Sequence, residues 1–172
     1  PVVFTSKLDD TVGAGGTFDT NNNGSATGPS PRDWGGIYAG PTSRLSIDYA
    51  RLAYGGGVTK LDSTFRAFNT IEVHQADARI AHTLFENNAD GFGGQGPGTR
   101  LGRLSNEPAT IFVRGAQPII IDNVFRNNTG SAITIDANSM TDDLLAASGR
   151  QTGDADRNPN YAANRGPLIR EN

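Results

Sequence analysis

The chain has 172 residues and a formal net charge of −3, which is the size of about one domain. An acidic chain lacks the basic face that nucleic acid requires, so the charge argues against that partner. The absence of cysteine excludes disulfides and thiolate catalysis, and no apolar run is long enough to span a membrane. With 22 glycines and 35% hydrophobic residues, the composition favours turns and short strands over long helices.

The N-terminal part of the chain is expected to hold two short strands separated by a long polar excursion. Residues 1–6 are a β-rich run, and residues 33–38 regain strand character after a stretch at about 7–32 rich in Gly, Asn, Ser and Pro. Because the chain begins with Pro1 rather than Met and shows no signal peptide, we expect a processed product or a piece of a larger protein.

Short apolar runs then recur along the chain. Residues 45–50 alternate apolar and polar side chains, which predicts a half-buried strand. The later runs lie at residues 71–73, 84–85, 111–113, 119–121 and 133–135. The span 136–166 is polar again, and within it residues 140–147 have the composition of one short helix. Residues 167–172 have the pattern of another unit that has just begun.

Two of these stretches repeat each other at a constant offset of 40 residues. Ile71 recurs as Ile111, Ile80 as Ile120, and the sequence FENN at 85–88 recurs as FRNN at 125–128. A fixed offset over several apolar and Asn positions indicates one structural unit used twice. Because such a unit cannot bury its apolar face alone, it needs a neighbour stacked on it.

The spacing predicts how the units stack. Strands of three to five residues, nine or ten apart and joined by Asn or Gly corners, fit coils of three strands that stack at about 4.8 Å. We therefore predict an all-β fold, a right-handed parallel β-helix solenoid of a few coils. It would form a single domain over 1–172 with polar insertions at about 7–32 and 136–166. The predicted ladder residues are Phe85, Asn87, Asn88, Phe125, Asn127 and Asn128.

The recurrence of Phe and Asn at these positions has a structural explanation. Phe would pack inward on the Phe of the next coil, while Asn tolerates left-handed backbone at a corner and its side chains can hydrogen-bond from coil to coil. With these residues the stretches IEV…RIAHTLFENNADGF and IFV…PIIIDNVFRNNTGSAITI resemble the repeats of pectin-lyase-like right-handed β-helix proteins.

The opening of the chain, PVVFTSKLDDTVGAGGTFDTNNNGS…DWGGI, is similar to segments of very large secreted or surface proteins of bacteria that carry β-helix repeats. This resemblance implies an extracellular or cell-surface location in a bacterium. It does not select a function, because the scaffold hosts lyases, hydrolases, adhesins and structural stalks.

Catalysis is not predicted. Enzymes of the resembled fold use carboxylate clusters, with Arg or Lys near calcium in the lyases. The candidate acids are Asp9, Asp10, Asp48, Asp142 and Asp143. A glycosidase needs two carboxylates about 5–10 Å apart over a groove, which adjacent loop acids do not supply by sequence alone. His74 and His82 have no metal-ligand spacing, and there is no Gly-x-Ser-x-Gly motif.

One loop has the pattern of a calcium site. The sequence DTNNNG at 19–24 supplies oxygen ligands at alternate positions, followed by the Gly that a sharp turn requires. Position 12 of the pattern is Ser30 instead of Glu, and Asp33 is the substitute ligand. The predicted ligands of a weak structural Ca2+ are thus Asp19, Asn21, Asn23 and Asp33. The alternative is a plain polar turn, and no other cofactor is expected.

Both ends of the predicted solenoid lack a capping helix, which natural solenoids use to cover apolar ends. Either flanking segments of a larger chain supply the missing coils, or copies stack head to tail so that the first strand of one completes the last coil of another. The predicted assembly residues are Val2, Val3, Phe4, Leu168 and Ile169.

The sequence therefore predicts a non-enzymatic extracellular structural protein that assembles end to end into a filament or stalk. Its partners would be copies of itself or flanking β-helix segments. The first alternative is an adhesin that binds glycans through Trp34 and Gly-rich loops. The second is a remnant of a polysaccharide lyase or hydrolase.

Overall fold

The computed structural model describes residues 1–12, 19, 21–40, 43–61, 64–74, 76–91, 106–136 and 166–172. Within these ranges the chain forms fourteen short strands and no helix. In chain order the strands are β1 (Val2–Phe4), β2 (Ile37–Ala39), β3 (Arg44–Asp48), β4 (Ala50–Ala53), β5 (Val58–Leu61), β6 (Thr64–Ala67), β7 (Ile71–His74), β8 (Asp77–Ala81), β9 (Leu84–Glu86), β10 (Ile111–Arg114), β11 (Ile119–Ile121), β12 (Val124–Arg126), β13 (Ile133–Asp136) and β14 (Leu168–Arg170).

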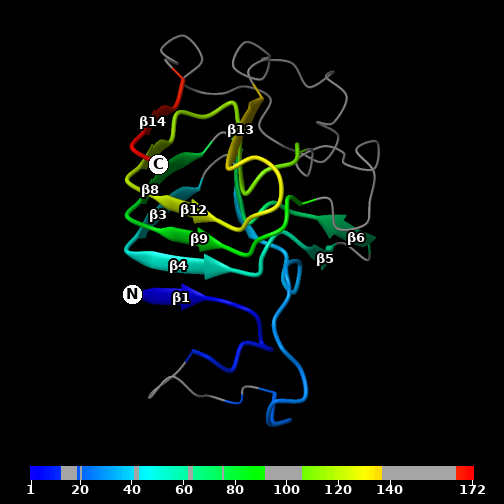
Figure 1. The fold of residues 1–172 in the computed structure, drawn as a ribbon. Helices are drawn as coiled ribbons and strands as arrows, with labels where there is room; N and C mark the ends of the chain where they lie inside the picture. Colours follow the sequence, from blue (N-terminus) through cyan, green and yellow to red (C-terminus); the bar gives the residue numbers. More distant parts are fainter. Residues whose placement is uncertain are drawn as a thin grey trace.

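Twelve of these strands form three parallel sheets of four strands each. The first sheet has the order β1-β4-β9-β12, the second β2-β7-β10-β13 and the third β3-β8-β11-β14 (Figure 1). The chain visits the second, third and first sheets in turn, so β2-β3-β4, β7-β8-β9 and β10-β11-β12 are three consecutive triplets. An antiparallel hairpin, β5-β6, is inserted between the first and second triplets.

The triplets lie on one another in register. Ile71 pairs with Ile111, Ile80 with Ile120, and Phe85 with Phe125, each through parallel strands. The 40-residue offset in the sequence is therefore the distance along the chain between paired strands of the second and third triplets. In parallel strands, equivalent residues of the triplets lie side by side and form one row. Residues in one row share the same surroundings, so each row favours side chains of one kind.

The apolar rows between the sheets form the core. Leu52, Ile71, Ile80, Phe85 and Ile120 are fully buried. The rings of Phe85 and Phe125 stack with centroids 4.9 Å apart. Burying one such side chain contributes about 1.5–3 kcal/mol, so the continuous rows hold the triplets together.

Residues with left-handed backbone turn the chain between sheets. At the corner between the third and first sheets these residues are Tyr49, His82, Asp122 and Glu171. At the corner that follows the first sheet they are Tyr54, Asn87 and Asn127. Non-glycine residues rarely adopt a positive φ, and Asn and Asp do so most readily. The recurrence of this strained conformation at the same place in each triplet shows that the corners repeat as the strands do.

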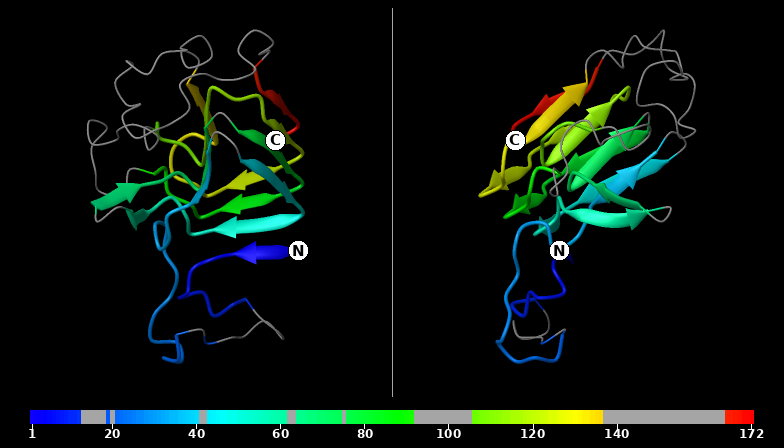
Figure 2. Two further views of the ribbon diagram at one scale, coloured as in Figure 1. Left: turned by 180° about the vertical axis from the view of Figure 1, so that it is seen from behind. Right: turned by 90° about the vertical axis from the view of Figure 1, so that its right-hand side faces the viewer.

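The prediction of an all-β fold is confirmed for the described residues, and the main sheets are parallel. The short helix expected at 140–147 lies outside those residues, as does most of the insertion at 136–166. Within the described part no helix is long and apolar enough to cross a membrane. Figure 2 shows that β1 lies at one end of the first sheet, with the excursion after it extending beyond that end.

Candidate functional site at the two ends of the sheets

Each parallel sheet has two edge strands, and these gather at two ends of the molecule. The edge strands β1, β2 and β3 form one end, here called the lower end because β1 is the lowest labelled strand in Figure 1, and β12, β13 and β14 form the other, upper end. A strand edge presents backbone N–H and C=O groups with no partner in its own sheet, which makes it a template for another strand. The two ends are therefore candidate interaction sites.

Large apolar side chains are exposed at both ends. At the lower end Val2 is 62% exposed and Phe4 39%. At the upper end the exposed apolar side chains belong to Val124, Ile135, Leu168 and Ile169. Inward-facing side chains in the middle of these rows, such as Phe85, Val113 and Ile120, are fully buried, whereas Val124 and Leu168 face outward, as does Ile119 on the inner strand β11. Within the described residues, the inward rows therefore end on apolar surface that no further strand covers.

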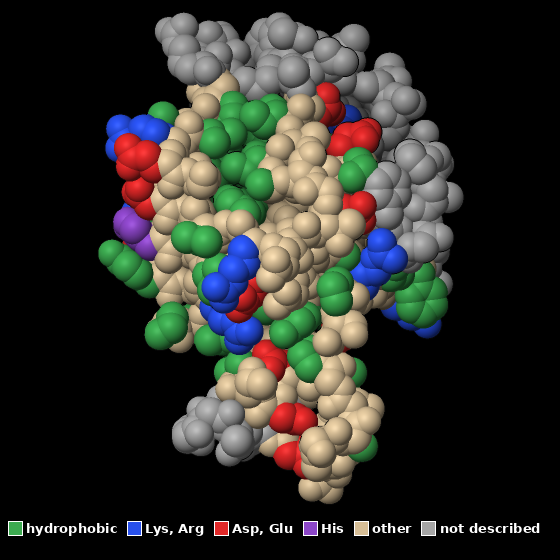
Figure 3. Space-filling view, in the orientation of Figure 1, with side chains coloured by type: hydrophobic (Ala, Val, Ile, Leu, Met, Phe, Trp, Pro, Cys, Tyr) green, Lys and Arg blue, Asp and Glu red, His purple; other side chains and the backbone are tan. Residues whose placement is uncertain are grey.

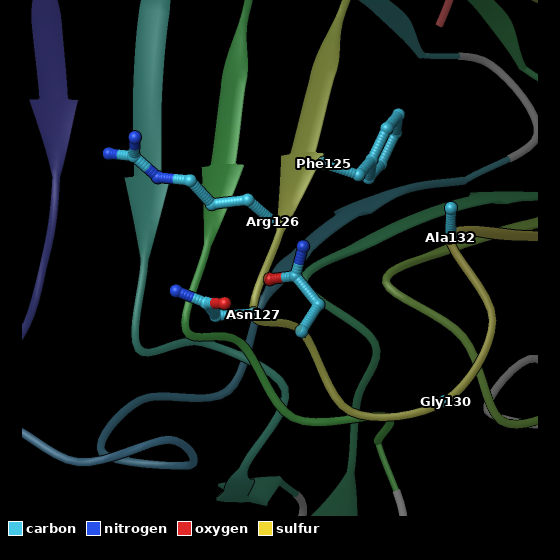
Figure 4. A pocket seen from close by; sticks show the side chains of 6 residues that line it. Phe125, Arg126, Asn127, Gly130 and Ala132 are labelled. Atoms are coloured by element: carbon cyan, nitrogen blue, oxygen red, sulfur yellow. The ribbon is translucent and has the colours of Figure 1, made fainter.

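A pocket of about 210 Å³ lies at the upper end beside β12. Its lining residues are Phe125, Arg126, Asn127, Asn128, Gly130 and Ala132. Figure 4 shows Phe125 on the open side of β12, while Arg126 extends back across the neighbouring strands of the first sheet. Figure 3, in the orientation of Figure 1, shows hydrophobic side chains gathered above a group of basic and acidic side chains on this face. The pocket therefore lies at an open end that also exposes apolar side chains, although three of its six lining residues, Arg126, Asn127 and Asn128, are polar.

A second pocket, of about 150 Å³, lies at the lower end. Its lining residues are Val2, Phe4, Ser46, Ile47, Asp48 and Ala50, which belong to β1, β3 and β4. Here β1 is the last strand of the first sheet, whereas the third sheet ends with β3. The lower end is thus stepped, with one strand of the first sheet projecting beyond the other two sheets.

The structure places the predicted assembly residues at opposite ends. Val2, Val3 and Phe4 form β1 at the lower end, with Val3 half-buried against β4. Leu168 and Ile169 lie on β14 at the upper end, where 54% and 39% of their surface is exposed. Because the two strands belong to different sheets and opposite ends, one copy of the chain does not bring these residues together.

A charge network that the sequence did not reveal crosses the outer face of the first sheet. The guanidinium groups of Arg51 and Arg126 both contact the carboxylate of Glu86, with Arg126 Nε donating to Oε2 at 2.8 Å. Arg51 also lies 3.6 Å from the buried Asp9. Burial alone would raise the pKa of Glu86, but the hydrogen bonds and charges of the two arginines hold that pKa below its usual range. The network joins β4, β9 and β12.

The predicted ladder residues lie at the corner after the first sheet. The Asn88 amide donates to Asn128 Oδ1 at 3.0 Å and to the Leu52 carbonyl at 2.9 Å. Its own oxygen accepts from the Gly55 N–H at 2.8 Å. Asn87 and Asn127 have positive φ, and Asn88 is fully buried. The hydrogen bonds of Asn88 thus join all three triplets at one corner.

A second asparagine ladder, which the sequence reasoning missed, lies at the opposite corner. Asn123 donates to Asn172 Oδ1 at 2.7 Å and to the Ile80 carbonyl at 3.0 Å. Its oxygen accepts from the Thr83 N–H at 3.0 Å. The signal was weak because Thr83 replaces Asn in the second triplet, although Asn123 lies at the same 40-residue offset.

The predicted calcium ligands lie in the long excursion and make hydrogen bonds of their own. Asp19 accepts from the backbone N–H groups of Asn23 and Gly24, and these hydrogen bonds lower its pKa. The Asn21 and Asn23 amides both donate to the Thr27 hydroxyl.

The fourth predicted ligand, Asp33, accepts hydrogen bonds from the Ser6 hydroxyl and the Ser30 N–H instead. Within the described residues no group of three His, Cys, Asp or Glu side chains is arranged to hold a metal ion. The oxygen-rich 19–24 turn has ligands of the kind that Ca2+ prefers, and calcium there stays a prediction.

The other candidate residues are engaged in the fold. Asp9 is buried and accepts from Thr5 and Thr11. Asp48 contacts the His82 ring nitrogen at 2.7 Å and Arg79 at 2.8 Å, and the His82 and Arg79 hydrogen bonds lower its pKa.

Trp34, named as a glycan-stacking candidate, is half-buried against the core. Its indole N–H donates to the Ala53 carbonyl at 2.8 Å. Asp10, the remaining candidate acid in the described part, is half-buried, and the acids at 142 and 143 lie outside that part.

A buried polar cluster covers the outer face of the second sheet. Glu72 is fully buried, and its carboxylate accepts from the Asn69 N–H at 3.0 Å and from the Asn106 amide. His74, also buried, lies between the rings of Tyr38 and Phe112, with Nε2 3.1 Å from Glu72 Oε2. Asn69 donates in turn to three backbone carbonyls, so the cluster fastens the segments that lead into β7 and β10.

No protein-family model, curated protein or solved structure matches this chain. A function must therefore be inferred from its edges, pockets and charge networks. Among these features, the two open ends combine unpaired strand edges, exposed apolar side chains and pockets in the same place.

Proposed function

We propose that the chain is a segment of a right-handed parallel β-helix, related to the pectin-lyase-like repeats that it resembles in sequence. The order of strands supports this winding, because each triplet passes through the same three sheets before the next begins. The recurrence of left-handed residues at equivalent corners supports it too. The right-handed sense follows from the strong preference for right-handed connections between parallel strands.

We further propose that this segment has a structural, non-enzymatic role and assembles end to end into an extracellular filament or stalk. The observation that carries the proposal is the pair of stepped ends, each with strand edges and exposed apolar side chains. Backbone hydrogen bonds from an added strand would satisfy the edges, and apolar contacts would continue the core. A head-to-tail contact of this kind does not close on itself, so it produces a filament.

The proposal assigns no catalytic role to the acids. Asp9 and Asp48 are held by hydrogen bonds that keep their carboxylates in the fold. Trp34 is likewise committed to the core, which removes the main feature that favoured glycan binding. The stepped ends remain the feature whose exposed apolar side chains a binding partner would cover.

The test is to change the upper end alone. The Ile169→Lys variant places a charge in an apolar row at the upper end, so it should abolish assembly while the single copy stays folded. Sedimentation velocity over a range of concentrations would measure the assembly, and circular dichroism would check the fold. The control is Phe65→Lys, at a large apolar residue on the β5-β6 hairpin that is exposed but lies away from both ends, and it should assemble as the unchanged chain does. Equal sedimentation of both variants would contradict the proposal.

A further inference from the structure

We infer that the joint between two copies has one register, in which β1 of the next copy adds to β12. In the same joint its β2 and β3 add to β13 and β14. This inference rests on the proposed end-to-end assembly and specifies its partner as a second copy of this chain. Three features favour a second copy as the occupant: the shapes of the ends, the residues in each row and the charges at the two edges of the third sheet.

The shapes of the ends are complementary. At the lower end the first sheet projects by one strand, because β1 lies beyond the triplet β2-β3-β4. At the upper end the second and third sheets project instead, because β13 and β14 lie beyond the triplet β10-β11-β12. The first sheet is therefore one strand short at the upper end, in the place where the open side of β12 is seen in Figure 4. Each sheet contains four strands, so one translation joins all three sheets without a gap.

The same translation continues one inward row of each sheet with residues of the same kind. In the first sheet Phe4 and Phe125 belong to one row, through Leu52 and Phe85. Phe4 of the next copy would thus stack on Phe125, as Phe125 stacks on Phe85 in the present structure.

The other two sheets follow the same rule. Ile37 and Ile133 share a row of the second sheet, and Ile47 and Ile169 share a row of the third. The joint would therefore place Ile on Ile in both sheets. A shift of one residue would turn these side chains to the outer face, so the apolar rows fix the register.

Charge complementarity points to the same register. Asp48 and Arg170 belong to one outward row of the third sheet, at its lower and upper edges. In the joint, Asp48 of the next copy would lie directly beside Arg170. Opposite charges facing each other across neighbouring strands are favourable, and like charges are not.

In one inward row of the first sheet, two residues would occupy the same position in the joint. Val2 pairs with Ala50, and Asn172 occupies the equivalent place above Asn123 at the upper end. In the joint, Val2 of the next copy and Asn172 would compete for that place. Because Asn172 is held by the Asn123 ladder, the added strand should begin at Val3, with Val2 turned aside.

The proposed register predicts the axial repeat of the filament and the residues of two copies that lie side by side. Four strands per sheet at the usual spacing give an axial repeat of about 19 Å.

Because the chain has no cysteine, single Cys variants can report directly which residues of two copies are neighbours. Leu168 and Ser46 share an exposed outward row, so Leu168→Cys mixed with Ser46→Cys is the in-register pair. Leu168→Cys mixed with Arg44→Cys, two residues along the same face of β3, is the matched off-register pair.

The experiment oxidises each mixture and measures disulfide-linked dimer on non-reducing gels, while diffraction from aligned fibres measures the repeat. The in-register pair should give roughly tenfold more dimer, because cysteines with Cα atoms beyond about 7 Å cannot be bridged without backbone movement. Fibres with equal cross-linking of both pairs, or with a different repeat, would overturn the register and leave end-to-end assembly standing. If the unchanged chain forms no assembly, both the register and the proposed function are wrong.

Discussion

The middle of the stack and its two ends are built from the same rows of side chains but bury them to different degrees. Phe85 in the middle is fully buried, whereas Phe4, in the same row at the lower end, is 39% exposed. Likewise Ile120 is fully buried and Ile169, its direct neighbour at the upper end, is 39% exposed. The apolar pattern thus continues beyond the point at which the chain supplies a covering strand.

This difference shows that burial in a stacked fold is decided by neighbours and not by the side chain itself. A residue in the middle contributes to the stability of a single copy, because its row is covered on both sides. A residue at an end is only partly buried in a single copy, so it contributes less to stability until another strand covers it. Substitution of a middle residue should therefore weaken the folding of a single copy, whereas substitution of an end residue in the same row should mainly weaken assembly.

The largest effect is expected in the row of Phe85. Phe85→Ala removes a fully buried ring between Leu52 and Phe125 and should lower the free energy of unfolding by about 3–5 kcal/mol. Phe4→Ala, in the same row at the end, should change the unfolding of a single copy by less than about 1 kcal/mol. It should nevertheless weaken assembly. Urea unfolding at a low protein concentration measures both values, and equal losses for the two variants would contradict the distinction between middle and end.

A smaller effect is expected at the asparagine corner. Asn88→Ala leaves the buried Leu52 carbonyl and Gly55 N–H without their partner, and should cost about 1–3 kcal/mol of unfolding free energy. Asn128→Ala, in the same ladder beside the upper pocket, should cost less because its side chain is only half-buried. Thermal or urea unfolding of the two variants provides the comparison. A larger loss for Asn128→Ala would mean that the upper corner is better covered than its exposure indicates.

The smallest effect is expected from the pH dependence of the charge network. The pKa of Glu86 is held below its usual range by Arg51 and Arg126, so its folded pKa lies below its unfolded pKa. The stabilisation is therefore fully present above the unfolded pKa and is lost as the pH falls through the folded pKa.

Urea unfolding of the chain and of Glu86→Gln at neutral and acidic pH would measure this contribution. The variant should be less stable at neutral pH, and the difference should narrow in acid. A difference that does not change with pH would show that the network acts through packing and not through charge.

The pairing of strands within the sheets could be predicted from sequence because residues that pair in parallel strands are of the same kind. Ile71 and Ile111 pair directly, as do Phe85 and Phe125, and both pairs are separated by 40 residues. A repeat in the sequence therefore identifies the neighbour in space, which a single apolar run does not. The β5-β6 hairpin lies before the two repeated stretches, between the first and second triplets, so the offset gives no signal for it.

The buried polar cluster could not be predicted in the same way. Alternation along β7 turns Glu72 and His74 away from the core, which would normally expose them to solvent. Both are buried, because Asn106 and the residues that follow it, up to Ala109, lie over the outer face of the second sheet. Asn106 lies 34 residues from Glu72 in the chain, and no local pattern links them. Contacts made by long connections depend on the path of the chain and leave no periodic signal.

The most direct test of end-to-end assembly is electron microscopy of the purified, unchanged chain over a range of concentrations. The proposal predicts unbranched fibres whose length grows with concentration, because the two stepped ends of different copies complete one another. Discrete particles of a single size at every concentration would contradict it, and would mean that the exposed rows at β1, β12 and β14 are not joints between copies.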